Sequence, residues 1–245
     1  MENTSFVFFD IGFTLLYAQG AAAYQEALAE LGFQIALPEI ERAFHLEDKR
    51  FMREFPGVFG NPVYSPMPWF LGGVNYRLGI RADLCAAAGL WRERQQRTRP
   101  YWVPFPGVRE VLSELQRRGI GLGVISNWDS SARGLLDSHG LSQFFDPIVI
   151  SSEVGAEKPA AEIFRTALQR AGMRGEQCLY VGDNYYDDAV GCRRAGMRPL
   201  IVNRFGRLGL EEITDCDIIT GLDQLLAYLN GAAPGGSPAV APGGA

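Results

Sequence analysis

Residues able to do chemistry stand directly after the apolar, β-rich runs of the sequence. Asp10 ends the first run, and Ser126 with Asn127 follows the second. The third run leads to Lys158 in GAEKP, and the fourth leads to Asp183 in GDNYYDD. A carboxylate, a hydroxyl and an ammonium are groups that nucleophilic catalysis uses, and clustered carboxylates also bind metal ions. Because these groups follow strands in order, they form a candidate active site.

Lys158 and the acid pair Asp187 and Asp188 each allow two interpretations. The chain has two lysines and twenty-one arginines, so a lysine at this place favours a need for a compact, rotatable ammonium. The alternative is a solvated loop charge. Asp187 and Asp188 stand at a predicted helix start, where acids also cap backbone amides and interact favourably with the helix dipole. Both interpretations stay open for these residues.

A parallel sheet is the element that would bring these groups together. Between the later apolar runs lie helical patterns such as GVREVLSELQRRG and AAEIFRTALQRAG, with apolar residues at three-and-four spacing. Strands that alternate with helices predict an α/β fold, a Rossmann-like, doubly wound parallel sheet whose ligands bind beyond the carboxyl ends of the strands. The predicted strands are Phe6–Phe9, Leu122–Ile125, Pro147–Ile150, Cys178–Val181, Pro199–Val202 and, more weakly, Asp217–Thr220.

A long helical insertion interrupts the alternation after the first strand. It is too long for a loop in a compact domain, so we expect a second, helical domain at residues 17–102. The catalytic core then comprises residues 1–16 and 103–230, with VPFPGV as the hinge on the return. Residues 231–245 form a Gly/Pro/Ala tail that we expect to be disordered.

Composition excludes several other classes of protein. The net charge of −5 argues against a generic nucleic-acid binder. The N-terminus has no secretory pattern, and the longest uncharged stretch contains four prolines, so no membrane partner is expected. Scattered cysteines are typical of reduced thiols and predict a cytoplasmic protein. His45 and His139 are the only histidines, which excludes a multi-histidine metal site, and no P-loop is present.

Four motifs, taken together, resemble those of the haloacid dehalogenase superfamily of phosphatases and dehalogenases. They are FFDIGFTLL, GVISN, EKP and VGDNYYDDAVGCRRAGM. The resemblance spans most of the predicted core, and the helical insertion stands where that superfamily carries its cap domain. It implies a hydrolase with a small phosphorylated or halogenated substrate, which residues of the cap would select.

The resemblance also implies a role for each candidate residue. Asp10 would be the nucleophile, and its attack on phosphorus would form an aspartyl-phosphate. Ser126 would hydrogen-bond a phosphoryl oxygen, while Lys158 would neutralise charge on the nucleophile and on the phosphoryl group. Asn127 and Thr14 would bind substrate or shape the loop that contacts it.

A Mg²⁺ cofactor is implied by the same resemblance. Asp10, Asp183 and the backbone carbonyl of Gly12 would ligate the ion, with water and substrate completing its octahedron. Asp188 would support the metal either directly or through another ligand, and Asp187 is a second residue able to do so.

Gly12 departs from the superfamily's pattern. Phosphatases of the superfamily usually carry an aspartate there, which protonates the leaving alkoxide and then activates water. A glycine retains the backbone carbonyl for the metal but removes the proton shuttle, and losing a general acid–base catalyst typically costs about 10²–10⁴-fold in rate. We therefore expect a phosphatase of reduced or specialised activity.

Three alternatives remain open. A 2-haloacid dehalogenase also lacks that aspartate, although Asp183 argues against it because similar dehalogenases need no metal. Phosphonate C–P hydrolysis would need a cap lysine, and Lys49 in LEDKR, the single candidate, is interpreted as a solvated charge. The third alternative is a catalytically weak pseudo-phosphatase that binds a ligand or partner through its cap. Its aromatic-rich stretch at residues 55–70 is explained more simply by packing.

Overall fold

Two compact units make up the computed structural model, which describes residues 4–58 and 66–233. The core unit lies within residues 1–17, 104–207 and 211–245. The helical unit comprises residues 18–103 together with residues 208–210. The predicted tail at residues 234–245 falls outside the described residues, so its disorder stays a prediction.

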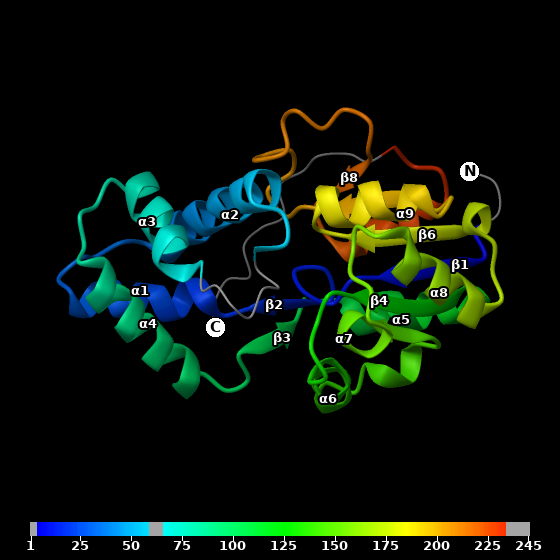
Figure 1. Cartoon of the computed structure of the whole chain (residues 1–245), viewed down its shortest axis with the longest axis horizontal. Helices are drawn as coiled ribbons and strands as arrows, with labels where there is room; N and C mark the ends of the chain where they lie inside the picture. Colours follow the sequence, from blue (N-terminus) through cyan, green and yellow to red (C-terminus); the bar gives the residue numbers. More distant parts are fainter. Residues whose placement is uncertain (1–3, 59–65, 234–245) are drawn as a thin grey trace. The chain divides into compact units, whose positions relative to one another are not determined.

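The core unit holds most of the strands, and the described part of the helical unit holds four helices. Figure 1 shows these elements along the chain. In chain order the elements are β1 (Phe6–Phe9), β2 (Leu16–Ala18), α1 (Gly20–Glu30), α2 (Leu37–Glu54), α3 (Met67–Arg77), α4 (Leu84–Arg97), β3 (Trp102–Pro104), α5 (Val108–Arg117), β4 (Gly121–Ser126), α6 (Ala132–Ser138), β5 (Ile148–Ile150), α7 (Ser151–Val154), α8 (Ala161–Ala171), β6 (Cys178–Gly182), α9 (Val190–Arg194), β7 (Arg198–Val202), β8 (Ile218–Ile219) and α10 (Leu225–Leu229).

A six-stranded sheet in the order β5-β4-β1-β6-β7-β8 forms the centre of the core unit. Every neighbouring pair is parallel, and all six predicted strands are present. β1 lies between β4 and β6 (Figure 1). In the register of these strands, Phe8 is opposite both Gly123 and Tyr180. The predicted α/β, doubly wound parallel sheet is confirmed.

Apolar side chains hold this sheet against its helices. All four residues of β1 are buried, as expected for a parallel strand covered on both faces. On one face, Phe8 and Tyr180 pack with Phe164 of α8 and Cys192 of α9. Burying each large side chain of this kind stabilises the fold by roughly 1.5–3 kcal/mol. The central strands are therefore a rigid support for the residues at their carboxyl ends.

The helical unit has its own aromatic core. Tyr24, Phe44, Phe70 and Trp91 come from four different helices, and Phe44 makes ring contacts with the other three. Asp83 caps α4 by accepting hydrogen bonds from the backbone amides of Cys85 and Ala86.

No helix in the described part of the chain is long and apolar enough to cross a membrane.

Three features of the structure were not predicted. β2 and β3 pair with each other where the chain leaves and re-enters the core unit, but strands of three residues show too little periodicity to detect. Leu208–Leu210 group with the helical unit, where the Leu208 carbonyl oxygen lies 2.9 Å from His45 Nε2. The interpretation of Lys49 as a solvated charge is wrong: the residue is 3% exposed, and Gly209 packs against its stem.

Candidate active site

Two carboxylates meet at the carboxyl edge of the sheet because their strands are neighbours. Asp10 directly follows β1, and Asp183 directly follows β6. The ladder extends one step beyond β1, because the Asp10 amide donates to the carbonyl oxygen of Val181 at 2.9 Å. This backbone contact sets the two strand ends, and hence the two acids, side by side.

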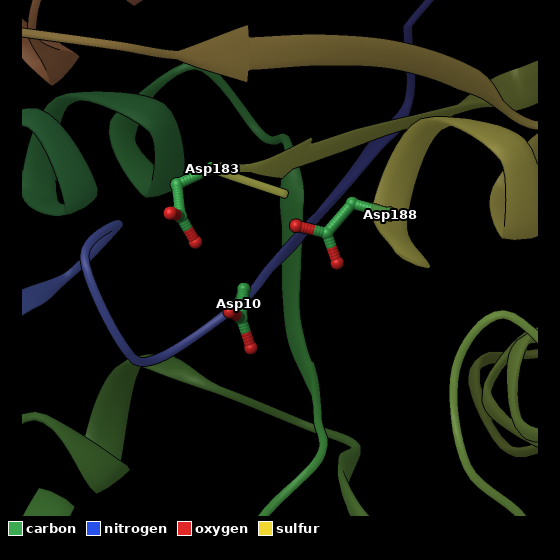
Figure 2. Close-up of side chains that lie close together, drawn as sticks. All are labelled: Asp10, Asp183 and Asp188. Carbon is green, nitrogen blue, oxygen red and sulfur yellow. The ribbon is translucent and has the colours of Figure 1, made fainter. Parts of the chain in front are cut away.

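A third acid, Asp188, joins them from the π-helical turn Tyr185–Ala189. One carboxylate oxygen from each of the three acids lies within 4.8 Å of the other two. All three aspartates are buried. Figure 2 shows the three carboxyl groups directed toward a common space. Oxygen ligands at such spacing suit a hard divalent cation such as Mg²⁺.

Glycine at position 182 is what makes room for Asp188. A Cβ atom there would lie 2.1 Å from Asp188 Oδ2, closer than any real contact allows. That oxygen accepts a hydrogen bond from the Asn184 amide at 2.9 Å, and the Asn184 side chain in turn accepts from the amides of Tyr186 and Asp187. The GDN sequence therefore fixes the start of the turn and the position of the Asp188 carboxylate.

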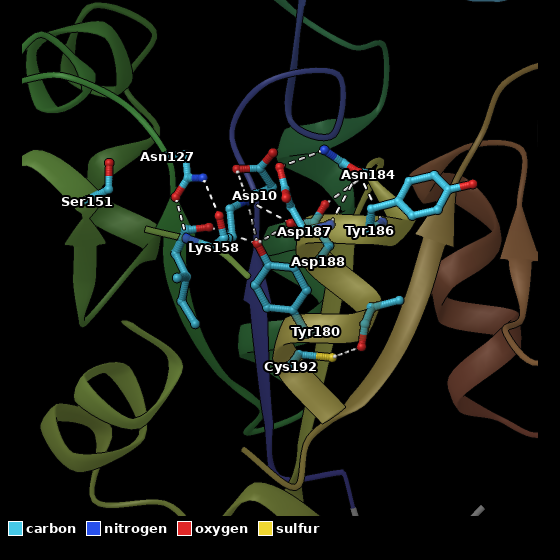
Figure 3. Close-up of polar contacts among 12 residues, drawn as sticks. Asp10, Asn127, Ser151, Lys158, Tyr180, Asn184, Tyr186, Asp187, Asp188 and Cys192 are labelled. Carbon is cyan, nitrogen blue, oxygen red and sulfur yellow. Dashed lines mark hydrogen bonds and ion pairs between the residues drawn. The ribbon is translucent and has the colours of Figure 1, made fainter. Parts of the chain in front are cut away.

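Lys158 is the cation at the centre of this group. Its ammonium nitrogen lies 2.7 Å from Asp188 Oδ1, 3.0 Å from Asp10 Oδ1 and 3.0 Å from the Tyr180 hydroxyl (Figure 3). Asn127 holds the backbone of the same residue, because its side-chain amide accepts from the Lys158 amide at 2.8 Å and donates to the Lys158 carbonyl at 3.0 Å. The interpretation of Lys158 as a solvated loop charge is wrong, since the side chain is buried.

The donor set fits a divalent metal ion. Asp10 Oδ1 is buried and has no directed hydrogen bond within the described residues, so its contact with Lys158 is an ion pair that leaves lone pairs open. Asp10 and Asp188, both buried, share the single ammonium of Lys158, which leaves an excess of negative charge on this pair of acids. A buried excess of this kind is costly unless a cation neutralises it.

The pKa values of Asp10 and Lys158 reflect burial first and then the charges around them. Burial raises the pKa of Asp10, the Lys158 ammonium lowers it and the neighbouring carboxylates raise it again, which brings it to about 6. Burial alone would lower the pKa of Lys158, but the carboxylates of Asp10 and Asp188 outweigh burial and raise it. Lys158 is therefore charged at neutral pH, and a bound cation would lower the pKa of Asp10 and favour its ionised form further.

Comparison with known proteins places this site in a family. A family model described as haloacid dehalogenase-like hydrolase matches residues 7–202, most of the chain. The chain belongs to the haloacid dehalogenase-like hydrolases. Haloacid dehalogenase-like hydrolase domain-containing protein 3 of Homo sapiens is 39% identical over 184 residues, covering 74% of this chain and 73% of that protein. The resemblance stated for the motifs is thereby confirmed.

Two further similarities concern part of the chain and the fold. Glyceraldehyde 3-phosphate phosphatase of Methanothermobacter thermautotrophicus is 40% identical over 106 residues, covering 41% of this chain but only 45% of that protein. The crystal structure of the HAD-hydrolase YfnB from Bacillus subtilis, bound to magnesium, matches with a TM-score of 0.60 and 20% identity, covering 94% of this chain and 100% of that one. The latter shows the shared fold alone.

Ser126 and Thr14 are two further candidate residues of this haloacid dehalogenase-like hydrolase. Ser126 ends β4 and is buried, and its hydroxyl lowers the pKa of Asp10 by hydrogen bonding. Thr14 is fully buried, and its hydroxyl has no hydrogen-bond partner within residues 4–58 and 66–233. Substrate binding by Thr14 and Asn127 stays a prediction, while the contact shown for Asn127 is with the Lys158 backbone.

Asp187 lies outside the three-acid cluster of this hydrolase. Its Oδ2 accepts a hydrogen bond from the Asn184 side chain at 2.8 Å, and the residue is only partly buried. Burial, followed by the charge of Asp188, raises the pKa of Asp187 to about 7. Its contribution to metal binding stays a prediction.

The loop after Asp10 bends sharply around Gly12. Gly12 itself is buried and forms an isolated bridge with Leu16, while the amides of Leu15 and Leu16 both donate to the Ile11 carbonyl. Phe13, the next residue, adopts a left-handed conformation with φ of 52°, which is unusual for a bulky side chain. Strained residues of this kind cluster in functional loops, and Phe13 stands three positions after the candidate nucleophile Asp10. Metal binding by the Gly12 carbonyl stays a prediction.

Sequence reasoning missed two residues that organise the site, Tyr180 and Asn184. Tyr180 is a polar exception in the otherwise apolar run CLYV, and that exception is the signal that would have found it. Asn184 follows the metal-ligand candidate Asp183 at the start of a helical turn, where asparagine favours capping. Both act through neighbouring residues, so neither stands out as a reactive group.

Proposed function

We propose that this chain is a Mg²⁺-dependent phosphohydrolase that acts on a small phosphorylated molecule through an aspartyl-phosphate on Asp10. The observation that carries the proposal is the buried contact of Asp10 with one ammonium and two further carboxylates. A nucleophile flanked by a metal-binding acid pair and a fixed cation suits an anionic, phosphorylated substrate. Relatives named as phosphatases support the same reaction class.

The first step transfers the phosphoryl group to the protein. A carboxylate oxygen of Asp10 attacks phosphorus, the bond to the leaving oxygen breaks, and that oxygen departs with the bonding electrons. Lys158 and the Ser126 hydroxyl stabilise charge on the transferring oxygens. Asp10, Asp183 and Asp188 would hold Mg²⁺, which neutralises phosphoryl charge when bound.

The second step returns Asp10 to its carboxylate. Water attacks the phosphorus of the aspartyl-phosphate, the bond between phosphorus and the Asp10 oxygen breaks, and inorganic phosphate leaves. Gly12 supplies no acid for the first step and no base for the second. The leaving group must therefore depart as a stable anion or take its proton from solvent, which favours acyl and aryl phosphates.

The four cysteines of the chain are all free thiols, three of them buried. Free thiols persist in a reducing compartment. We therefore propose a cytoplasmic location for the phosphohydrolase.

A substrate panel tests the proposed reaction against its alternatives. Aryl, acyl and alkyl phosphates and 2-haloacids are each incubated with Mg²⁺ or with a chelator, using the native chain, Asp10→Asn and the control Asp137→Asn. Asp137 is an exposed acid of α6 and serves as the matched substitution. We expect Mg²⁺-dependent phosphate release that Asp10→Asn abolishes and Asp137→Asn leaves unchanged.

Other outcomes would assign the chain elsewhere. Metal-independent halide release would identify a 2-haloacid dehalogenase. Phosphate release that survives Asp10→Asn would exclude the aspartyl-phosphate. No turnover of any substrate, combined with Mg²⁺-dependent phosphate binding, would identify a binding protein.

Phosphonate hydrolysis is tested at Lys49, which lies on α2 with its ammonium nitrogen 3.5 Å from Met52 Sδ. Borohydride trapping with a phosphonoaldehyde would detect a Schiff base between this lysine and the aldehyde.

A further inference from the structure

Tyr180 places a buried phenol hydroxyl on one face of the sheet, before the carboxyl end of β6. It lies in the middle of β6 and is fully buried. Its ring packs edge-on against Phe164 at 5.2 Å between centroids, a contact that phenylalanine would make equally well. The hydroxyl therefore needs an explanation separate from packing.

The hydroxyl is anchored on the backbone of another strand. It donates to the carbonyl oxygen of Ile125 in β4 at 2.8 Å. β4 and β6 are not neighbours, because β1 lies between them. Tyr180 thus reaches across β1, on a face where Gly123 makes room for the ring of Phe8, since a Cβ atom at Gly123 would lie 2.6 Å from that ring.

The same hydroxyl accepts a hydrogen bond from Lys158. The ammonium is 3.0 Å from the hydroxyl oxygen and 5.6 Å from the ring centroid, so it approaches the hydroxyl end of the ring rather than the face of the ring. A phenol has one proton, and the shorter distance assigns it to Ile125, since Asp188 Oδ1 lies farther away at 3.2 Å. The oxygen is then free to accept from Lys158 (Figure 3).

These contacts define the position of the ammonium. Of its three protons, one is directed to Tyr180 and one to Asp188 at 2.7 Å, while Asp10 is held as an ion pair. The Ile125 carbonyl is held in the sheet and accepts the hydrogen bond of the Tyr180 hydroxyl, which sets the position of that hydroxyl. The hydroxyl oxygen in turn accepts from Lys158 and so sets the position of the ammonium. Two directed bonds leave the third proton for Asp10 or for a phosphoryl oxygen.

We propose that Tyr180 is a positioning residue that holds the Lys158 ammonium between Asp10 and Asp188. Its effect on turnover rests on the proposed phosphohydrolase function, but its effect on Lys158 does not. Without the hydroxyl, one ammonium proton and the Ile125 carbonyl lose their buried partners, and an unsatisfied buried group drives rearrangement. Lys158 would then turn toward the carboxylates and lie away from the position that serves the transferring group.

Because the chain has only two lysines, NMR can test whether Tyr180 holds the Lys158 ammonium. A chain labelled with ¹⁵N-lysine gives two side-chain ammonium signals, and Lys49→Arg assigns them. In the native chain we expect slow proton exchange for Lys158. Tyr180→Phe should speed that exchange by about tenfold, because a buried hydrogen bond is lost. Tyr228→Phe is the matched control, since it removes a buried hydroxyl that donates to Asp217 at 2.8 Å, on another side of the core unit.

Kinetics supplies the second measurement. Tyr180→Phe should lower kcat by about ten- to a hundredfold and change KM by less than about twofold, because the ammonium is displaced rather than removed. Tyr228→Phe should leave both constants unchanged. If Lys158 exchange is the same in the native chain and in Tyr180→Phe, the proposal is overturned, whatever happens to kcat. If the native chain turns over no phosphate, the proposed function fails, while the exchange measurement still decides the role of Tyr180.

Discussion

The core unit and the helical unit each bury carboxylate charge, and they compensate for it differently. In the helical unit, Glu47 is 1% exposed and its two oxygens each lie 2.9 Å from an arginine, Arg50 on one side and Arg77 on the other. In the core unit, the buried acids Asp10 and Asp188 share the one ammonium of Lys158. The helical-unit cluster of Glu47, Arg50 and Arg77 has two cations for one carboxylate. The cluster around Lys158, called the core cluster below, has one cation for the carboxylates of Asp10 and Asp188.

The difference teaches how to separate a structural charge from a functional one. Glu47 packs against Gly73, where a Cβ atom would lie 2.0 Å from its Oε1, so the carboxylate fills a shaped space and is fully paired. Buried groups that are fully paired stabilise or specify a fold. Around Asp10, in contrast, burial and the neighbouring carboxylates together raise its pKa to about 6, although the Lys158 ammonium lowers it. Charge imbalance, rather than burial, marks the candidate active site.

Removing the carboxylate of Asp10, the proposed nucleophile, should distinguish the two clusters most strongly. Asp10→Asn should lower kcat on an aryl phosphate by at least about a thousandfold, as expected for loss of a covalent catalyst. Its Tm without metal should stay the same or rise, because one of three mutually repelling carboxylates is gone. Steady-state kinetics and thermal unfolding in a chelator measure both effects. Retained turnover would remove Asp10 from the mechanism, and a large fall in Tm would show that the core cluster is structural after all.

Adding a carboxylate at Gly12 should have the next largest effect. Gly12→Asp restores an acid–base group, so kcat on an alkyl phosphate should rise by about a hundredfold, within the range of a general acid. On an aryl phosphate, whose leaving group needs little protonation, we expect less than about tenfold. Gly12→Asn is the matched control, with the same size and no acid. Equal gains on both substrates, or an equal gain with asparagine, would contradict this explanation.

Magnesium should stabilise the core cluster in a pH-dependent way. The pKa of Asp10 is about 6 in the folded chain and 3.8 for an unperturbed aspartate, so the folded state binds that proton more tightly. This contribution to stability is present below about pH 4 and is lost as pH rises through about 6. Mg²⁺ needs ionised carboxylates, so its stabilisation should grow from about pH 5 to about pH 8 and reach about 2.7 kcal/mol at a hundred times its Kd.

Thermal unfolding with and without Mg²⁺ across that pH range measures the effect. Asp183→Asn should abolish the response to Mg²⁺, because it removes one of the three ligands. Glu47→Gln should keep the response. A Mg²⁺ response that is constant with pH would mean that Asp10 does not take part in binding.

Much of the fold could be predicted because its signals are local. The six strands are apolar runs, and the groups at their carboxyl ends converge because parallel strands end at one edge of the sheet. Asp10, Asp183 and Lys158 were identified in this way, and the structure brings them together. β2 and β3 carry only three residues each, which is too short for a periodic signal.

The details that were missed depend on contacts between distant residues. Tyr180 and Ile125 are 55 positions apart, and no local pattern predicts that the hydroxyl of one binds the carbonyl of the other. Lys49 was interpreted as solvated because its neighbours in LEDKR are charged, yet Gly209, far along the chain, covers its stem. Glu47 likewise looks like an ordinary helix charge until Gly73 and Arg77 are placed beside it.

Neutralising Glu47 should have the smallest effect and should act on stability alone. Glu47→Gln leaves Arg50 and Arg77 without their shared carboxylate, but these arginines are 40% and 30% exposed, so solvent screens the loss. We expect a loss of about 1–3 kcal/mol in the free energy of unfolding, less than for a fully buried pair. Glu162→Gln is the control, since its pair with Arg165 is solvent-exposed and should leave Tm unchanged. Urea unfolding measures the loss, and kcat should be retained. If Glu47→Gln instead lowered kcat without lowering stability, a fully paired cluster would be functional, and charge imbalance would no longer distinguish the two units.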